Sequence, residues 1–184
     1  MGKKLKIING NVILPHRIIE DGSVLIENGI IKEIGEKKKS AKADVILDAK
    51  GNYISPGFID IHIHGGGGSD FMDGTVKDFL TIAETHLQHG TTSMVPTTLT
   101  AEKEDLLDIL SVYGNAYTQN KKGAQFLGMH IEGPYFAMSQ KGAQDARYIR
   151  KPEKKEYQEI IQKHGDIISR WSAAPEIEGV LGAI

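Results

Sequence analysis

The apolar positions near the N-terminus fall in short runs that are separated by turn signals, a pattern typical of β-strands. The dipeptide Asn28-Gly29 stands between two of these runs and predicts a hairpin, whereas Asn9-Gly10-Asn11 predicts a turn after the first run. We expect strands at residues 5–8, 12–14, 23–27, 30–34 and 45–47. These strands are too few to close a core of their own. Residues 1–52 are therefore interpreted as a partial β-sandwich whose other strands are missing or supplied elsewhere.

From about residue 53 the pattern changes to an alternation of strand and helix. Thr100 is expected to cap the second helix, because acidic residues follow it in the first turn. Strands are predicted at 56–65, 91–99, 126–131 and 167–174, with helices at 75–88, from residue 100 to about 113, and at 152–163. Such alternation favours a parallel sheet with helices outside.

Four strands and three helices amount to half of a (βα)8 barrel, which needs about 250 residues when it is complete. The predicted fold class is therefore α/β, with residues 53–184 as the truncated first half of such a barrel, preceded by the strands of a small β-sandwich. An open sheet is the alternative. The preferred interpretation is that the sequence is a piece of a longer protein.

The strand at 56–65 carries the first candidate chemistry. Side chains alternate along a strand, so its isoleucines point to one face while Asp60, His62 and His64 point to the other. Two imidazoles two residues apart on one strand can reach a single metal ion. The glycines at 65–68 end the strand and let backbone come close to whatever sits there. A half-buried strand with two incidental histidines is the alternative.

The end of the third predicted barrel strand carries the second group of candidate functional residues. Glu132 follows His130-Ile131 and precedes Gly133-Pro134, and the carboxyl ends of parallel strands hold the active sites of barrels and open sheets. We expect Glu132 to face His62 and His64. Its neighbour His130 is ambiguous. Ala143 and Gln144 lie in the polar loop that follows and can reach over the site, although spacing alone is a weak signal. On the first helix, His86 and His89 are interpreted as structural or surface residues.

Composition narrows the function further. The 184 residues carry a net charge of −2 and no cysteine, which gives no reason to expect a nucleic-acid or membrane partner. Any metal must be held by His, Asp or Glu, and these ligands suit zinc, iron, cobalt or nickel. The basic run at 37–39 is expected to form a solvated loop. We find no signal peptide and no apolar segment of about 20 residues, so a cytoplasmic protein is expected.

Several segments together resemble a known family. The segment at 56–65 is similar to the opening strand of the amidohydrolase superfamily, and the chain as a whole resembles the N-acetylglucosamine-6-phosphate deacetylases. The likeness rests on His130-Ile131-Glu132-Gly133-Pro134-Tyr135, Lys141-Gly142-Ala143 and Ala174-Pro175-Glu176. It implies a metal-dependent (βα)8 barrel beside a β-sandwich and hydrolysis of N-acetylglucosamine 6-phosphate to glucosamine 6-phosphate and acetate.

By this resemblance Glu132 binds the essential metal, zinc in the first instance, and His62 and His64 match members that hold a second metal. Ala143 and Gln144 match positions that contact the sugar, although the family often has His where Gln144 stands. The family's catalytic aspartate, two further metal histidines and a phosphate-binding arginine come from later strands. No catalytic residue is therefore assigned in this chain, and we expect it to be inactive alone.

The partner implied is a small amino-sugar phosphate. The unpaired edges of a half-barrel further predict self-association or poor solubility unless the remaining half is supplied in trans, and a homo-oligomer is expected. Two alternatives stay open: another amidohydrolase, such as a cyclic amidase or a deaminase, and a non-catalytic half-barrel. A carboxylated lysine commonly bridges the metals of two-metal amidohydrolases, but the strand at 167–174 has Arg170 and no lysine, which counts against the first alternative.

Overall fold

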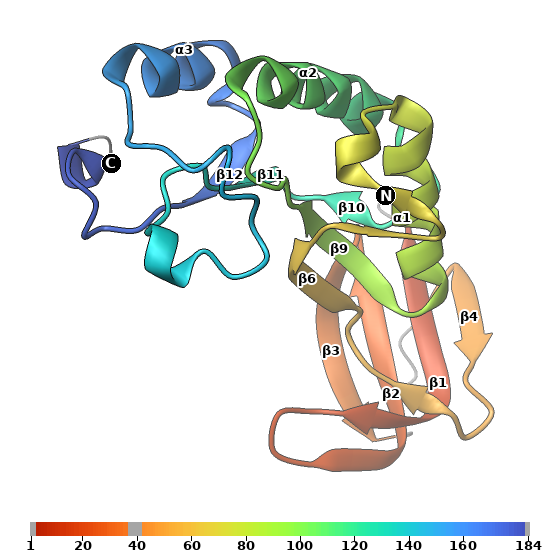
Figure 1. Cartoon of the computed structure of the whole chain (residues 1–184). Helices are drawn as coiled ribbons and strands as arrows, with labels where there is room; N and C mark the ends of the chain where they lie inside the picture. Colours follow the sequence, from red (N-terminus) through yellow and green to blue (C-terminus); the bar gives the residue numbers. More distant parts are fainter. Residues whose placement is uncertain (1–2, 37–41, 183–184) are drawn as a thin grey trace. The chain divides into compact units, whose positions relative to one another are not determined.

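The computed structural model describes residues 3–36 and 42–182. The chain folds into two compact units, Met1–Pro56 and Gly57–Ile184, and Figure 1 colours the chain along its sequence from red to blue. The boundary predicted after residue 52 lies slightly before this division, because Tyr53–Ile54 still pairs with the first strand of the first unit. The basic run at 37–39 lies outside the described residues. In the described part of the chain, no helix combines the length and the apolar character that crossing a membrane requires.

The first unit contains one five-stranded sheet among its described residues, with the order β3-β2-β1-β4 and β5 paired to β1. The antiparallel pairs β1–β2 and β2–β3 form a meander, whereas β4 and β5 run parallel to β1. Its strands are β1 (Lys4–Ile13), β2 (Ile18–Glu27), β3 (Ile30–Glu36), β4 (Val45–Asp48) and β5 (Tyr53–Ile54).

One of the two predicted turns in this unit is present and the other is wrong. Asn28 and Gly29 adopt left-handed φ values of 54° and 76° between β2 and β3, as a two-residue hairpin loop requires. Asn9, with φ of 56°, instead lies inside β1, where the pairing with β2 shifts register between Ile7 and Gly10. The pair Asn9-Gly10 therefore makes a bulge within one long strand. Asn tolerates the left-handed conformation that a bulge needs, so the strand continues through it.

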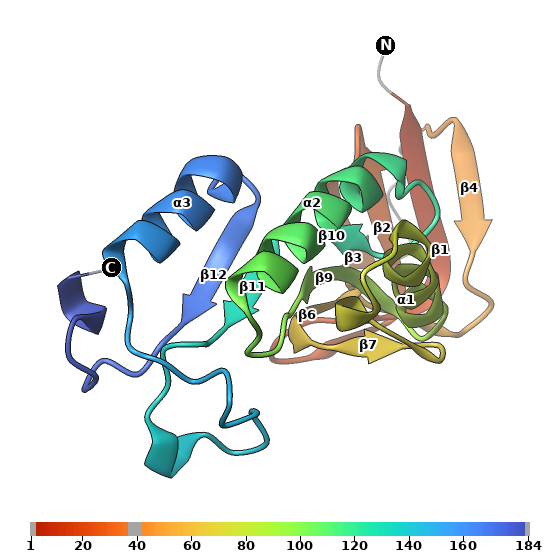
Figure 2. The same ribbon diagram turned by 45° about the horizontal axis from the view of Figure 1, so that its top comes forward.

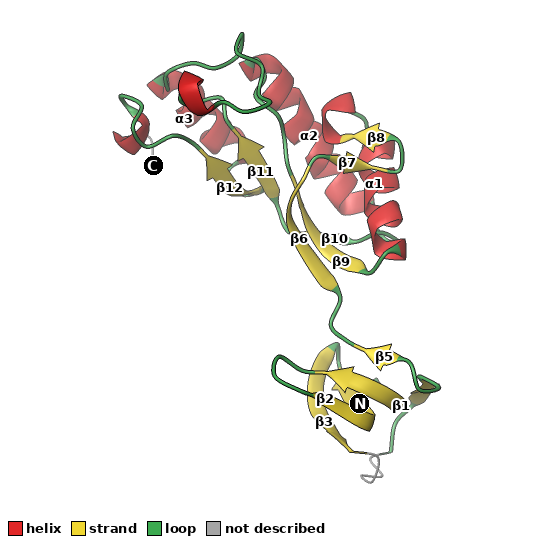
Figure 3. Ribbon diagram, turned by 60° about the horizontal axis from the view of Figure 1, so that its bottom comes forward, coloured by secondary structure: helices red, strands yellow, loops and turns green. Residues whose placement is uncertain are grey.

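The second unit alternates strand and helix as the sequence predicts. Parallel pairing joins β6, β9 and β10 in one sheet and β11 and β12 in another, and a parallel bridge between Thr97 and His130 links the two. Figure 3 shows α1 and α2 along one side of these strands. The main elements are β6 (Phe58–Ile63), α1 (Val76–Gln88), β9 (Thr91–Pro96), α2 (Lys103–Gln119), β10 (Gln125–Phe126), β11 (Met129–Glu132), α3 (Lys154–His164) and β12 (Ile168–Ser172). Short elements complete it: β7 (Gly65–Gly66), β8 (Ser69–Asp70), η1 (Phe71–Asp73), η2 (Met138–Gln140) and η3 (Val180–Gly182).

Two local predictions in this unit are wrong. The strand expected at 126–131 is two strands, because Gly128 adopts φ of 108° and ends the extended run between β10 and β11. Thr100 does not cap α2. Its main-chain N–H donates to Gln144 Oε1 at 2.8 Å, and Glu102 takes the N-cap position. The isoleucines on the apolar side of β6 are exposed in this structure: Ile59 is 63% exposed and Ile61 is 59% exposed.

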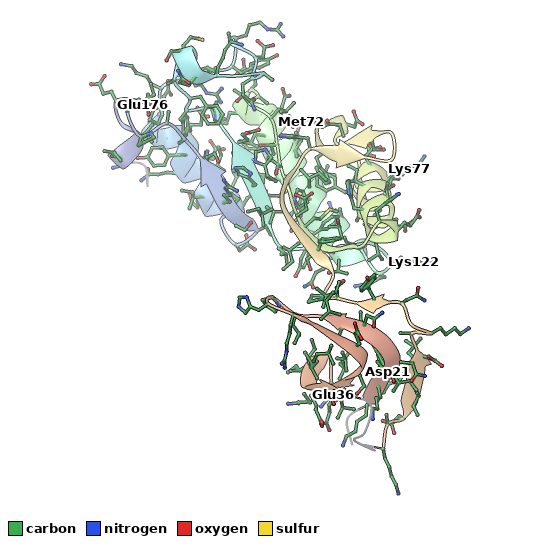
Figure 4. The ribbon with its side chains drawn as sticks, turned by 90° about the horizontal axis from the view of Figure 1, so that it is seen from below. Asp21, Glu36, Met72, Lys77, Lys122 and Glu176 are labelled. Carbon is green, nitrogen blue, oxygen red and sulfur yellow. The ribbon has the colours of Figure 1, made fainter. Side chains whose placement is uncertain are left out.

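The hydrophobic core of this unit joins side chains of the helices to side chains of the strands, and Figure 2 shows α1 and α2 alongside β9 and β10. Phe79 on α1 is fully buried, and its ring lies 4.8 Å from that of Phe71 and 5.9 Å from that of Tyr113. Such aromatic contacts fix the helices on the strands that carry the candidate site. Charged side chains such as Lys77 and Lys122 lie at the outer edge of the unit (Figure 4).

Candidate metal centre

Two imidazoles converge at the carboxyl end of β6. The Nε2 atoms of His62 and His64 lie 3.2 Å apart. His64 Nδ1 lies 3.2 Å from the main-chain carbonyl oxygen of Thr97, which can only accept a hydrogen bond. His64 therefore carries its proton on Nδ1 and presents the lone pair of Nε2, the form that binds metals. The main-chain N–H of His62 donates to Asp60 Oδ1 at 3.1 Å.

A carboxylate from β11 completes the group. Glu132 Oε1 lies 3.5 Å from His62 Nε2, and Glu132 Oε2 lies 3.3 Å from His64 Nε2. Main-chain hydrogen bonds fix the residue, because its N–H donates to Thr98 Oγ1 at 3.2 Å and its carbonyl accepts from Thr100 Oγ1 at 3.4 Å. The strand end thus presents its carboxylate to both imidazoles.

The three side chains fit a divalent metal ion. Zinc bonds to nitrogen and oxygen are about 2.0–2.2 Å long, so neighbouring ligands of a tetrahedral ion lie about 3.3–3.6 Å apart. The Nε2 atoms of His62 and His64 lie 3.2 Å apart, and each faces its own oxygen of the Glu132 carboxylate, Oε1 at 3.5 Å from His62 and Oε2 at 3.3 Å from His64. Two imidazoles and one carboxylate are also a donor set that zinc, iron, cobalt and nickel accept. The structure therefore brings together the three residues that the sequence selects as metal ligands.

His130 lies beside the group, and the sequence left its role ambiguous. Its side chain is fully buried, and its ring centroid lies 4.9 Å from that of His62. His130 Nε2 is within 2.7 Å of Ser172 Oγ on β12. Burial, followed by the charge of Arg170, lowers the pKa of His130 to about 4. At neutral pH this imidazole is therefore uncharged and occupies the interior next to His62.

Ala143 and Gln144, the two loop residues that the resemblance selected, differ in their exposure to solvent. Ala143 is exposed in a turn, whereas only 9% of Gln144 is exposed. The Gln144 amide bonds to the main chain of Thr100 on one side and to Glu132 Oε2 on the other, each at 2.8 Å. Their contact with a sugar stays a prediction.

Sequence reasoning missed the hydroxyl groups that hold the centre. Thr97 Oγ1 accepts the main-chain N–H of Ile63 at 3.1 Å, and Thr98 Oγ1 holds Glu132 as described above. Both threonines are fully buried. The position of these threonines in the sequence was the signal. They lie at the carboxyl end of a predicted parallel strand, which is the edge of the sheet where the candidate ligands also lie.

On α1, His86 is structural, as expected. Its Nε2 lies 3.1 Å from the Gly65 carbonyl oxygen. A Cβ added to Gly66 would lie 2.5 Å from that ring nitrogen. The glycine run therefore lets the chain pack closely against α1 as it leaves β6.

Comparison with known proteins agrees with this architecture. N-acetylglucosamine-6-phosphate deacetylase of Haemophilus influenzae is 32% identical over 176 residues, which are 94% of this chain and 45% of that protein. N-acetylgalactosamine-6-phosphate deacetylase of Escherichia coli is 31% identical over 90% of this chain and 43% of its own length. The chain thus spans about half the length of the curated relatives that it matches.

Solved structures give the same result. The crystal structure of N-acetylglucosamine-6-phosphate deacetylase from Pasteurella multocida superposes with a TM-score of 0.82 at 28% identity, covering 95% of this chain and 46% of that one. The predicted α/β fold, the first part of an amidohydrolase barrel, is confirmed. The sequence profile of the Amidohydrolase family matches residues 53–176, and the chain therefore belongs to the amidohydrolase family.

Proposed function

We propose that this chain carries the metal-binding part of a deacetylase that hydrolyses the acetamide of N-acetylglucosamine 6-phosphate to glucosamine 6-phosphate and acetate. One observation carries the proposal: the Nε2 atoms of His62 and His64 and the carboxylate of Glu132 converge with separations of 3.2–3.5 Å. The relative from Haemophilus influenzae, which bears the name of this activity, supports the choice of substrate.

In this proposal, His62, His64 and Glu132 hold a divalent metal, with zinc as the first choice. A bound divalent ion supplies a Lewis acid that polarises a carbonyl and brings the pKa of water toward about 7. The chain's own residues prepare the site. The Thr97 carbonyl keeps the lone pair of His64 Nε2 directed inward, and Thr98 fixes the end of β11 that bears Glu132.

The chain alone is proposed to be inactive. Amide hydrolysis needs a group that takes a proton from water and returns it to the leaving amine. The described metal group contains one carboxylate, Glu132, and that carboxylate is used as a ligand. We place the general base, the remaining ligands and the phosphate contact in the part of the relatives' length that this chain does not span. A cytoplasmic location and a homo-oligomeric state stay predictions.

One relative suggests a second substrate. The Escherichia coli protein named for N-acetylgalactosamine 6-phosphate is 31% identical, close to the 32% of the Haemophilus influenzae enzyme. The two sugars differ only in the configuration of one hydroxyl group. Both belong in any activity assay.

A zinc titration tests the centre. We expect the chain to bind zinc, measured by competition with a chromophoric chelator, and we expect Glu132→Gln and His64→Asn to lower the affinity at least about 10-fold because each removes a ligand. His16→Asn is the matched control, because His16 is exposed in the first unit. Equal affinity in all four proteins would remove the metal centre from the proposal.

A chimera tests the reaction. Replacing the matching 45% of the Haemophilus influenzae enzyme with this chain should give a protein that releases acetate from N-acetylglucosamine 6-phosphate, whereas the Glu132→Gln chimera should not. A folded, zinc-loaded chimera without turnover would contradict the assignment. The chain alone, with zinc added, should release no acetate from either sugar phosphate, and robust turnover would refute its proposed inactivity.

A further inference from the structure

Gln144 is tied to the metal-binding carboxylate by a hydrogen bond that its burial preserves. The residue lies in the loop after η2, and only 9% of it is exposed. Its Nε2 donates to Glu132 Oε2 at 2.8 Å. The same oxygen lies 3.3 Å from His64 Nε2. The amide therefore touches the carboxylate on the side that faces the candidate ion.

The orientation of the Gln144 amide is dictated by its second partner. The main-chain N–H of Thr100 is only a donor and lies 2.8 Å from Gln144 Oε1. The acceptor end of the amide must face Thr100. The NH₂ end is then directed at Glu132, where it can only donate. The amide thus presents a fixed donor to the carboxylate rather than a group that can flip.

The loop that carries Gln144 is held in place on its own account. Lys141 Nζ donates to the Gln144 carbonyl oxygen at 3.0 Å, and the Gln144 N–H donates to the Lys141 carbonyl at 3.1 Å. Both main-chain groups of Gln144 are paired in this way, so its side chain approaches Glu132 from a fixed backbone.

We propose that Gln144 is a positioning residue for the metal ligand Glu132. A carboxylate rotates about its last bond unless a neighbour restrains it. The Gln144 donor holds Oε2, and the two oxygens then face His64 and His62, as observed at 3.3 and 3.5 Å. This inference rests on the proposed metal centre and adds a residue that binds no metal itself. It gives Gln144 a different role from the sugar contact that the resemblance implies.

The test compares two glutamines in one region of the chain. Gln144→Met keeps nearly the same length and removes the donor, whereas Gln140→Met is the matched control, because Gln140 is exposed at the end of η2. Loss of an outer hydrogen bond to a ligand typically lowers metal affinity about 10- to 100-fold. We expect that loss in Gln144→Met and wild-type affinity in Gln140→Met, measured by zinc competition on the whole chain.

A cobalt spectrum separates positioning from stability. Cobalt(II) bound in place of zinc reports ligand geometry through its visible absorption, so Gln144→Met should shift or weaken the bands, whereas a residue that only stabilises the loop should leave both affinity and spectrum unchanged. Gln144→Ala provides a second variant if the methionine variant does not fold, since water can then reach the Thr100 N–H.

Each outcome decides one of the two proposals. Wild-type zinc affinity and an unchanged cobalt spectrum in a folded Gln144 variant would overturn the positioning role, provided that Glu132→Gln weakens binding. If Glu132→Gln and His64→Asn bind zinc as tightly as the wild type does, the metal centre itself fails, and with it this inference.

Discussion

Replacing Tyr113 with Phe tests how the core supports the strand that bears Glu132. Tyr113 lies on α2 and is 1% exposed, and its Oη accepts the main-chain N–H of Gly128 at 3.0 Å. Gly128 stands at the break between β10 and β11. The phenylalanine fits the same space but leaves that N–H without its partner.

The expected cost is worked from burial and hydrogen bonding. A donor left unpaired in the interior costs about 1–3 kcal/mol, and we expect Tyr113→Phe to lower the free energy of unfolding by that amount at pH 8. Burial also raises the pKa of Tyr113 to about 12 from its ordinary value of 10. The neutral phenol is therefore favoured in the folded state. The stability that depends on a neutral Tyr113 is complete below pH 10. It is lost as the pH rises from 10 through 12.

The second part of the test compares the free energies of unfolding of the two proteins at two pH values. At pH 11 most unfolded tyrosine has released its proton and most folded tyrosine has not, so the wild type loses on the order of 1 kcal/mol that the variant does not lose. Urea unfolding at pH 8 and pH 11 should therefore show the difference between the two proteins shrinking by that amount. Other ionising groups are common to both proteins and cancel.

Tyr117→Phe is the matched control, because Tyr117 is on the same helix and 52% exposed; it should stay within about 0.5 kcal/mol of the wild type at both pH values. An unchanged stability of Tyr113→Phe at pH 8, or a difference that is the same at pH 8 and pH 11, would refute the reasoning.

Two further substitutions examine the core and the end of β11. Phe79→Ala should lower the free energy of unfolding by about 3–5 kcal/mol, because Phe79 is fully buried against Phe71 and Tyr113; urea unfolding measures this, and a loss no larger than that of Leu87→Ala, at a site 38% exposed, would contradict it. Gly133→Ala should destabilise the protein and weaken zinc binding, because the added Cβ would lie 2.3 Å from Thr100 Oγ1 beside Glu132. Gly142→Ala shares a left-handed φ but meets no atom within 4 Å, so it should cost only about 1 kcal/mol of backbone strain and leave zinc affinity unchanged.

The parts of the site that the sequence predicts are those that follow from strand geometry. Alternation along β6 places His62 and His64 on one face, and the common carboxyl edge of parallel strands brings Glu132 to them. Both rules act through main-chain geometry, and they hold here although the pairing of β6 with β9 shifts register between Asp60 and Ile63. The Asn28-Gly29 hairpin is predictable for a similar reason, since its left-handed residues lie between two regular strands.

The parts that the sequence does not predict depend on pairings between distant segments. Gln144 and Thr100 are 44 residues apart, and nothing in the periodicity of either segment indicates that the Gln144 side chain will accept the main-chain N–H of Thr100. Gly128 is similar, because its break in the strand is supported by Tyr113 from another element. Local propensity favoured a helix that starts at Thr100 and one continuous strand at 126–131. Tertiary hydrogen bonds overrode both preferences.

The separation of the three proposed ligands is set by Thr97 and Thr98, which follow a strand that carries none of them. His62 and His64 belong to the end of β6, Glu132 belongs to β11, and the end of β9 bonds to both segments. Thr97 accepts from His64 Nδ1 and, through its hydroxyl, from the Ile63 N–H. Thr98 donates its main-chain N–H to the His130 carbonyl at 3.0 Å and accepts the Glu132 N–H through its hydroxyl. Because both threonines are buried, these hydrogen bonds are shielded from competing water. The spacing of the three proposed ligands is therefore a property of this backbone framework, and the role proposed for Gln144 concerns only the last rotation of one carboxylate within it.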